Sequence, residues 1–277
     1  MGAALMHTGY YIGFFLAALA NFFVGSHFGW RYMFILGGVP AFLIGWIRNN
    51  VQEPARWEKK LKLTMYRSFM ELFSPLYRRR TILNSTYLIV SLAGLWAGSV
   101  YAPSAITFIA QRAGRTAADA ARLASYCTAL LAIGTVLGAL VVPLLADRLG
   151  RRFTLGIFYT LMMASIGVAF GYVFYMGAGA LTWFMVCSFF LGLGGANFIV
   201  YSFWLPEQYG TECRASAFAF TTNIGRFAAA GFTFLVGTGI RHYQTLGTPV
   251  ALTALAFVIG LALLPFGEET KGKPLPA

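Results

Sequence analysis

The chain has 277 residues, of which 58% are hydrophobic and 11% charged, whereas soluble domains carry roughly 25% charged residues. This excludes a water-soluble globule and indicates a helical membrane protein, because the apolar runs are continuous and do not alternate as barrel strands do. The net charge of +12 is concentrated in a few polar segments, which fits membrane topology and not nucleic-acid binding. Three widely spaced cysteines indicate neither a disulfide framework nor a zinc site.

Apolar runs between polar segments predict eight membrane-spanning helices. A span needs about 20 apolar residues to cross a hydrocarbon core of about 30 Å. The predicted spans are Gly2–Val24, Trp30–Ile47, Thr81–Ala110, Ala121–Leu145, Phe153–Phe174, Leu181–Phe203, Ser216–Ile240 and Pro249–Phe266. The fold class is therefore an all-α membrane protein.

Basic residues predict the orientation of these spans. Fifteen of the 21 Lys and Arg residues fall on the side that includes residues 48–80 and the C-terminal tail, five fall on the other side, and Arg226 lies inside a span. Because basic residues are retained on the cytoplasmic face, we expect both termini in the cytoplasm. The expected localisation is the cell inner membrane, with multiple passes.

The spans divide unevenly along the chain. Two spans in residues 1–47 precede a basic connection at 48–80, and six spans in residues 81–267 precede a tail at 268–277. The long connection is the expected linker between two bundles. Its segment Lys59–Phe73 is interpreted either as an amphipathic helix on the anionic inner leaflet or as a solvated basic loop.

The turn A-D-R-L-G-R-R at residues 146–152 joins two antiparallel spans. Gly150 permits the tight reversal. A carboxylate at Asp147 is unfavourable at the carbonyl end of its own helix, so we expect it to face the N-terminal end of another helix or an arginine. Such a contact would hold two helices together in one conformation and release them in another.

This turn resembles the signature D-R-x-G-R-R turn of the major facilitator superfamily. Four other segments are similar to family motifs in order and spacing, namely QEPARW at 52–57, PEQYGTECR at 206–214, NIGR at 223–226 and EETKGKPLP at 268–276. They resemble, in turn, the boundary after the sixth helix, the loop before the eleventh, a polar element within the eleventh and the tail after the twelfth. Gly210 departs from the loop motif, where the family has proline.

The resemblance implies a twelve-helix fold in two six-helix bundles, in which the eight spans correspond to helices five to twelve. The chain would then be a fragment or the product of a late start codon, with a six-plus-two channel as the alternative. The resemblance also implies a cytoplasmic gate of charged residues that holds the bundles together. The implied gate residues, whose alternative role is topology and solvation alone, are Asp147, Arg148, Arg152, Glu207, Arg214, Glu53 and Arg56.

Ionisable residues inside the spans are few. All nine acidic residues lie in connections or at span ends, so the candidate for proton coupling is His7, since free histidine has a pKa of about 6.5. A packing role for His7 stays open. Arg226 lies about 15 Å into its span at 1.5 Å per residue, near the midplane. A charge at this depth faces a cavity or a partner, so Arg226 binds a substrate carboxylate or pairs with an acid elsewhere.

Further candidates for a substrate cavity come from glycine-containing spans. The run 94–103 holds Gly94, Gly98 and Pro103, and the run 192–195 is GLGG; both allow a helix to bend and expose backbone groups. The resemblance identifies these spans as helices seven and ten, which line the family's central path. The polar side chains in these regions, for which helix packing is the alternative role, are Tyr87, Trp96, Tyr101, Asn197, Tyr201 and, beside Arg226, Asn223.

The sequence therefore predicts a secondary carrier that works by alternating access, and not an enzyme. No nucleotide-binding loop, metal cluster or nucleophile with a positioned base is visible, and no cofactor is indicated. The expected substrate is a small organic acid, carboxylate or sialate-like, with proton coupling. A neutral sugar and a non-transporting membrane fragment are the alternatives. The expected partners are the solute, protons and the lipid bilayer, without nucleic acid.

Overall fold

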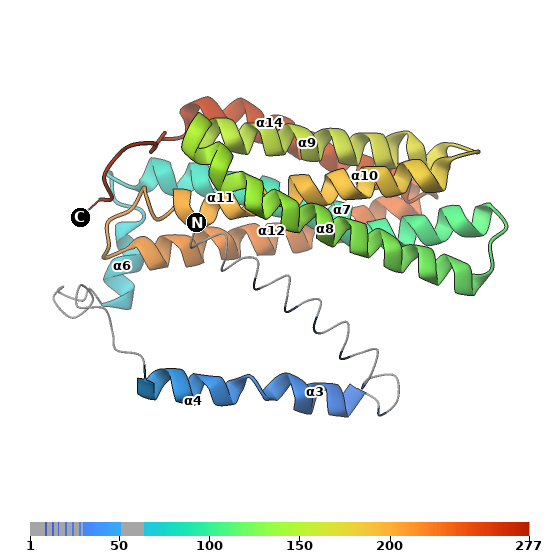
Figure 1. Cartoon of the computed structure of the whole chain (residues 1–277). Coiled ribbons are helices and arrows are strands. Elements are labelled where there is room, and N and C mark those ends of the chain that lie inside the picture. The colour runs from blue at the N-terminus through green and yellow to red at the C-terminus, as the bar shows by residue number, and fades with distance from the viewer. Residues whose placement is uncertain are drawn as a thin grey trace. The chain divides into compact units, whose positions relative to one another are not determined.

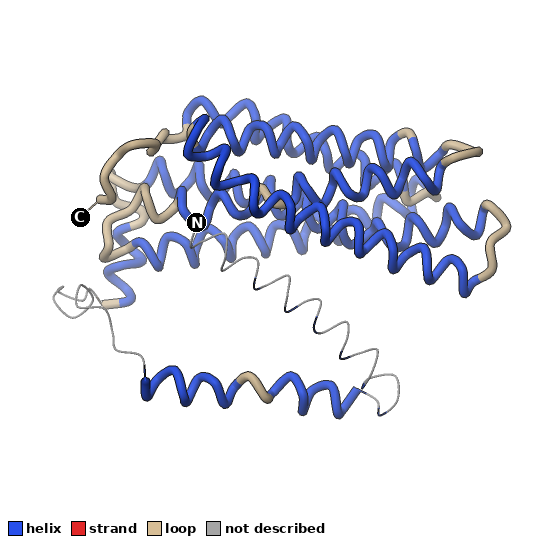
Figure 2. Tube along the Cα trace, viewed as in Figure 1, coloured by secondary structure: helices blue, strands red, loops and turns tan. Residues whose placement is uncertain are grey.

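The computed structural model describes residues 30–50 and 64–276, together with six single positions between residues 9 and 28. The candidates His7, Glu53 and Arg56, and most of the first predicted span, lie outside the described residues. The chain divides into two compact units, one of residues 5–64 and one that contains residues 65–277. Helices make up the described part of both units, and no strand occurs in that part (Figures 1 and 2).

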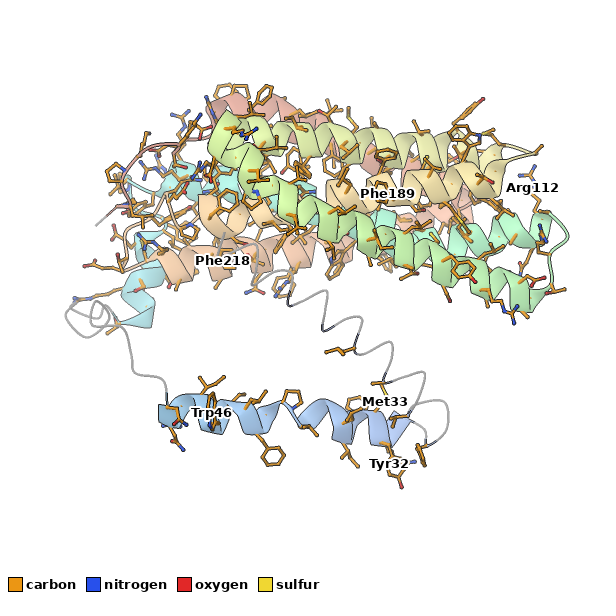
Figure 3. The ribbon with its side chains drawn as sticks, in the orientation of Figure 1. Tyr32, Met33, Trp46, Arg112, Phe189 and Phe218 are labelled. Atoms are coloured by element: carbon orange, nitrogen blue, oxygen red, sulfur yellow. The ribbon has the colours of Figure 1, made fainter. Side chains whose placement is uncertain are left out.

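The described part of the first unit is a helix pair, α3 (Trp30–Gly38) and α4 (Ala41–Asn50). The predicted span Trp30–Ile47 is therefore interrupted at residues 39–40, because Pro40 lacks an N–H and its ring displaces the preceding turn. Tyr32, Met33 and Trp46 project from this pair (Figure 3). Its side chains are apolar and mostly exposed, with Phe42 at 83%, as expected of a helix that lipid or other helices cover.

The second unit is a bundle of long helices that begins with a short one. Its elements are α6 (Met65–Glu71), α7 (Arg78–Arg112), α8 (Ala117–Leu149), α9 (Arg151–Gly171), α10 (Ala180–Gly195), α11 (Phe198–Trp204), α12 (Arg214–Tyr243), α13 (Gly247–Leu252) and α14 (Ala256–Leu263), with 3-10 turns at Val173–Tyr175, Thr253–Leu255 and Leu264–Phe266. The positions of these helices agree, to within a few residues, with those of the six spans predicted between Thr81 and Phe266.

Eight membrane-spanning helices were predicted, and the described residues contain a smaller number that are apolar enough to cross a membrane. Six described stretches meet that requirement, including Arg31–Asn50 and five in the bundle. Most of the first predicted span lies outside the described residues. The 30-residue α12 is long enough but not apolar enough, because polar residues including Asn223 and Arg226 lie in its middle.

Glycines set the packing inside the bundle. A Cβ added at Gly134 of α8 or Gly192 of α10 would collide with a backbone carbonyl of the other helix, so these two helices approach too closely for any larger residue. A Cβ added at Gly94 or Gly98 of α7 would collide with a side chain instead, that of Phe257 or of Leu191. The glycine-rich runs therefore pack helices together here and do not open the cavity expected from sequence.

The predicted span Leu181–Phe203 is broken between α10 and α11. Gly194 and Gly195 weaken the helix, and the Asn197 side-chain amide donates to the Gly194 carbonyl at 2.9 Å, which replaces a helical hydrogen bond. The bend anticipated from GLGG is thus present, although Asn197 is fully buried.

The structure describes residues 64–73 of the segment Lys59–Phe73. Met65–Glu71 form α6, which agrees with the interpretation as a helix over this part. Phe69 and Phe73 contact the ring of Phe220 on α12, and the Ser68 hydroxyl donates to the Glu212 carbonyl at 2.9 Å. Phe69 and Phe73 are still 37% and 44% exposed, so only part of the apolar face packs on protein.

Candidate functional site

Most charged side chains gather at one end of the bundle, which we call the charged end: Arg80, residues 146–152, Glu207, Arg214 and residues 268–273. Its centre is the turn at Gly150, whose φ of 94° favours glycine. A Cβ at Gly150 would also lie 2.7 Å from a Glu269 carboxylate oxygen. Glycine at position 150 therefore allows both the reversal of the chain between α8 and α9 and the close approach of the Glu269 carboxylate.

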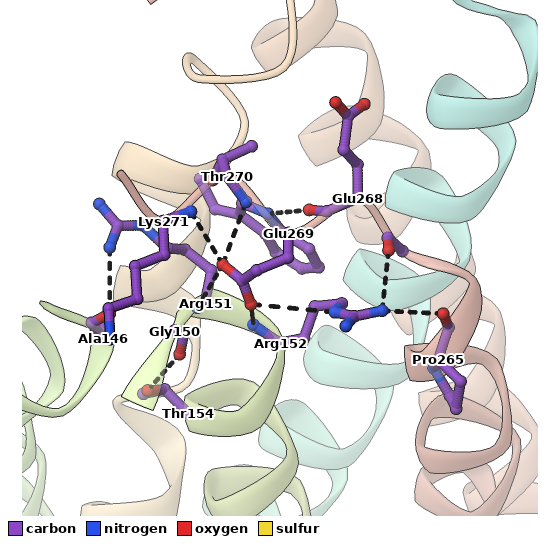
Figure 4. Close-up of polar contacts among 12 residues, drawn as sticks. Ala146, Gly150, Arg151, Arg152, Thr154, Pro265, Glu268, Glu269, Thr270 and Lys271 are labelled. Atoms are coloured by element: carbon purple, nitrogen blue, oxygen red, sulfur yellow. Dashed lines mark hydrogen bonds and ion pairs between the residues drawn. The ribbon is translucent and has the colours of Figure 1, made fainter. Parts of the chain in front are cut away.

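Glu269 caps the N-terminus of α9 from the C-terminal tail. Its carboxylate accepts the backbone N–H of Arg151 at 3.0 Å and of Arg152 at 3.1 Å, and also those of Thr270 and Lys271 (Figure 4). Burial opposes ionisation of Glu269, but these four N–H groups outweigh it and hold the pKa of the carboxyl below its ordinary value. The position at a helix N-terminus that we considered for Asp147 is thus occupied by Glu269.

The central ion pair joins Arg151 to Glu207. The guanidinium donates from Nε at 3.0 Å and from Nη2 at 2.8 Å to the two carboxylate oxygens, which is a bidentate geometry. The side chains are only 12% and 18% exposed. Asp147 lies 3.4 Å from Nη1 of Arg151 and is 74% exposed, so it faces an arginine, as one of its two expected arrangements required.

The other predicted gate residues of the bundle hold backbone carbonyls. Arg152 donates to the Pro265 carbonyl at 2.9 Å, and its Nε lies 3.8 Å from Glu269 (Figure 4). Arg214 donates to the carbonyls of Tyr209 and Pro276. These contacts, together with the Arg151–Glu207 pair, tie the tail and the 205–213 loop to the starts of α9 and α12.

Arg148 contributes to the network at the charged end through its backbone carbonyl. Its carbonyl accepts a hydrogen bond from Lys271 Nζ at 2.7 Å. The structure therefore brings all five described gate residues to one end, and it pairs Glu207 with Arg151, which was not among the predicted gate residues.

Six charged residues of this network were missing from the predicted gate: Arg80, Arg151, Glu268, Glu269, Lys271 and Lys273. Glu268 pairs with Arg80 at 2.7 Å and with Lys273 at 3.2 Å. A signal was present in the sequence, since two adjacent glutamates follow the last span and two adjacent arginines begin α9. Their pairing depends on where the tail lies, which the sequence does not show.

Three of the predicted substrate residues lie inside the bundle. Tyr87, Asn197 and Tyr201 are fully buried. The Tyr87 hydroxyl donates to the Leu263 carbonyl at 2.8 Å, and Tyr201 lies 2.7 Å from Ser91 and 2.6 Å from Tyr159. In the described structure these side chains contact protein and do not face a cavity.

The hydroxyls of Ser91, Tyr159 and Tyr201 form a hydrogen-bonded cluster. The Tyr159 hydroxyl donates to the Tyr87 carbonyl at 2.7 Å, which can only accept. Ser91 donates to Tyr159 at 3.1 Å, and the Tyr201 hydroxyl lies within hydrogen-bond distance of both. The cluster connects α7, α11 and α9 at the level of the α10–α11 break.

The remaining predicted substrate residues lie on more open faces. Asn223 and Arg226 are exposed on α12, whereas Trp96 and Tyr101 on α7 are partly exposed. Arg226 lies twelve residues after the first residue of α12, which is about 18 Å along it. No ion pair joins Arg226 to any residue in the described part of the chain. Within that part, no group of three His, Cys, Asp or Glu side chains could hold a metal ion.

Comparison with known proteins agrees with these features. The chain is 29% identical over 290 residues to a Haemophilus influenzae protein named as a metabolite transport protein (99% of this chain, 66% of that one). It is 29% identical over 298 residues to a Cupriavidus pinatubonensis protein named as a 4-methylmuconolactone transporter (98% and 66%). It is 25% identical over 283 residues to the cis,cis-muconate transport protein of Acinetobacter baylyi (97% and 64%).

The chain thus spans about two thirds of the length of these relatives. A family model matches residues 1–232, and that model describes the Major Facilitator Superfamily. The five motifs at 52–57, 146–152, 206–214, 223–226 and 268–276, the helical bundle and this match agree with one another. The chain belongs to the Major Facilitator Superfamily.

Proposed function

We propose that this protein is a secondary carrier that moves a small organic acid across the cell inner membrane. The observation that supports this most directly is Arg226, a cation that is exposed near the middle of α12 and has no ion-pair partner in the described part of the chain. A charge at this depth requires a compensating group. A substrate carboxylate supplies one through the two parallel hydrogen bonds of a guanidinium fork.

The neighbouring side chains fit an unsaturated acid. Asn223 lies three residues before Arg226, on the same exposed face of α12, and offers an amide to a second oxygen. Trp96 lies on α7, the helix that packs beside α12, and offers a ring face. Tyr101 already donates its hydroxyl to the Thr233 carbonyl of α12 at 3.3 Å. The relatives named for muconate and 4-methylmuconolactone handle compounds of this class.

The buried candidates take a different part in the proposal. Tyr201 ties α11 to α7 and α9, Asn197 bonds to the Gly194 carbonyl within the break, and Tyr87 joins α7 to α14. These side chains hold helices together and do not contact the solute in this conformation. We assign substrate contact to Arg226, Asn223, Trp96 and Tyr101.

The charged end is the proposed gate. Alternating access requires contacts that form in one state and break in another, and the network of Arg151, Glu207 and Glu269 joins segments that are distant in sequence. Glu53 and Arg56 would add the contribution of the first bundle. In this scheme residues 1–47 are the last two helices of that bundle, residues 48–80 the linker and residues 81–267 the second bundle.

Proton coupling through His7 is the remaining element of the proposal. A proton-coupled carrier needs a group that titrates near neutral pH and changes its exposure. Replacing His7 with Gln should abolish accumulation driven by a pH gradient while counterflow of the solute persists. Equal loss of both activities would assign His7 to folding.

Uptake into vesicles that contain the purified protein tests the function. We expect saturable uptake of cis,cis-muconate, competition by other small carboxylates, and no competition by the corresponding diamide, which has the same shape without charge. Competition by the diamide, or by a neutral hexose in place of the acids, would overturn the organic-acid assignment and favour the sugar alternative. No saturable uptake of either solute class would favour a non-transporting membrane fragment.

The proposed orientation places the charged end in the cytoplasm. Single cysteines at Lys273 and at Arg115, which lie at opposite ends of the bundle, test it in a cysteine-free background. A membrane-impermeant thiol reagent added to intact cells should label only the Arg115→Cys protein. Labelling of Lys273→Cys alone would reverse the orientation.

A further inference from the structure

A groove on the outside of the bundle is lined by residues of α9, of α14 and of the segment that follows α14. Its volume is about 960 Å³, and apolar side chains such as Phe153, Ile157 and Leu261 supply most of its lining. Gly156, Thr160 and Ala164 recur every four residues along α9 and also line it. Residues at this spacing share one helix face, and their small size leaves the space between the two helices unfilled.

The groove runs inward from the charged end. Its polar lining residues at that end are Arg152 and Glu269. From Arg152 to Ala164 is twelve residues, or about 18 Å of helix, which is slightly more than half of a hydrocarbon core of about 30 Å. The groove therefore extends from the level of the headgroups to about the bilayer midplane.

The mouth of the groove has an excess of positive charge. The Glu269 carboxylate already accepts four backbone N–H groups, and Asp147 faces Arg151. Arg148, next to the lining residue Leu149, is exposed, and Lys271 lies within hydrogen-bond distance of its carbonyl. Arg152 remains 37% exposed (Figure 4). Arg152 is thus the cation that lines the groove, and the exposed Arg148 and Lys271 lie beside its charged end.

We propose that this groove binds an anionic phospholipid. Its phosphate would contact Arg148, Arg152 and Lys271, and one acyl chain would lie along Gly156, Thr160 and Ala164. Charge-assisted hydrogen bonds from arginine favour a phosphate over a neutral headgroup, and basic residues at the surface attract anionic lipids. An acyl chain suits the remainder of the groove, since it is apolar and about one leaflet deep. Because Arg152 also holds the Pro265 and Gly267 carbonyls, the bound lipid would stabilise the docked tail.

Lipid retention by the purified protein tests this proposal. The protein is placed in nanodiscs with equal phosphatidylglycerol and phosphatidylcholine, extracted with detergent, and examined by native mass spectrometry. We expect one retained phosphatidylglycerol per protein, in at least five-fold excess over phosphatidylcholine. Arg148→Gln removes an exposed cation, and Ala164→Phe fills the inner end of the groove from an exposed position; each should reduce retention at least five-fold.

The matched controls are Arg122→Gln on the opposite end of α8 and Val168→Phe one turn beyond the groove on α9. Both should retain phosphatidylglycerol as the parent does. Equal retention of the two lipids, or unchanged retention in Arg148→Gln and Ala164→Phe, would show annular lipid only and overturn the proposal. Displacement of the lipid by soluble glycerol phosphate, with retention unaffected by Ala164→Phe, would also overturn it, because the site would then bind a free anion.

Discussion

The charged end and the exposed face of α12 place arginine in opposite surroundings. At the charged end, Arg80 and Arg151 each contact a carboxylate within 3.0 Å. On α12, Arg226 is exposed near the middle of the helix without a carboxylate from any described residue. The difference separates two roles for the same side chain. An arginine paired within the fold holds segments together, whereas one left unpaired at membrane depth is available to a ligand or to a partner elsewhere in the protein.

The largest expected effect is on stability at the charged end. Arg151→Ala leaves the mostly buried Glu207 carboxylate without its bidentate partner, and breaking such a pair costs about 3 kcal/mol. Denaturant unfolding in detergent should show this loss, and exchanging the two residues in Arg151→Glu/Glu207→Arg should recover part of it. Asp147→Ala is the control, since an exposed pair contributes only about 0 to 1 kcal/mol. A similar loss of stability in Arg151→Ala and Asp147→Ala would show that the buried Arg151–Glu207 pair contributes no more than the exposed Asp147–Arg151 pair.

The opposite result is expected on α12. Arg226→Ala should change stability by less than about 0.5 kcal/mol, but weaken binding of a carboxylate by about 1 to 3 kcal/mol. Arg226→Lys keeps the charge without the bidentate geometry, so its affinity for the carboxylate should lie between those of the parent and of Arg226→Ala. Ligand-dependent thermal stabilisation measures both quantities, with Arg241→Ala at the end of α12 as control. If the Arg226→Ala protein unfolds readily, and removal of an acid elsewhere in the protein restores its stability, then Arg226 forms a structural ion pair. Arg226 and Arg151 would then have the same role.

A smaller effect is expected in the interior, at the neutral hydroxyl cluster of Ser91, Tyr159 and Tyr201. Tyr201→Phe removes one hydroxyl of this cluster and should cost about 1 kcal/mol. The exposed Tyr172→Phe should be neutral. A double-mutant cycle with Ser91→Ala separates the hydrogen bond from packing. A coupling energy of zero would mean that the hydroxyls do not hold the α10–α11 break.

The smallest effect is the pH dependence of the tail. The folded-state pKa of Glu269 is lowered, so its contribution is fully present above the unfolded value of about 4.3 and is lost as pH falls through the lower folded value. The carboxyl is partly exposed, so the change should stay below about 1 kcal/mol. Thermal unfolding between pH 6 and pH 3 should show a steeper decline below about pH 4.3 for the parent than for Glu269→Gln. The exposed Glu212→Gln protein should follow the parent, and identical slopes in all three would contradict the capping role.

The helices of the second unit were predictable because the bilayer imposes a simple requirement. A run of about 20 apolar residues bounded by charges specifies a span, and the predicted Thr81–Ala110 became α7 with only short extensions into Arg78 and Arg112. The breaks within predicted spans were only partly predictable from the sequence. Pro40 breaks one helix for a covalent reason, whereas the break before Asn197 needed glycines and a side-chain hydrogen bond together.

The charges show where prediction from sequence stops. That Asp147, Glu207 and the arginines of the 146–152 turn gather at one end follows from the order of the spans alone. The choice of partner does not. Arg151 and Arg152 are adjacent in sequence, but successive residues on a helix point about 100° apart, so only the packing of α9 decides that Arg151 faces Glu207 while Arg152 faces the tail. The amino-acid sequence determined which residues share a membrane depth, because length and hydropathy act locally. The tertiary structure decided which of them touch, because contact depends on helix rotation and on the path of the tail, and both are set by the packing of the whole bundle.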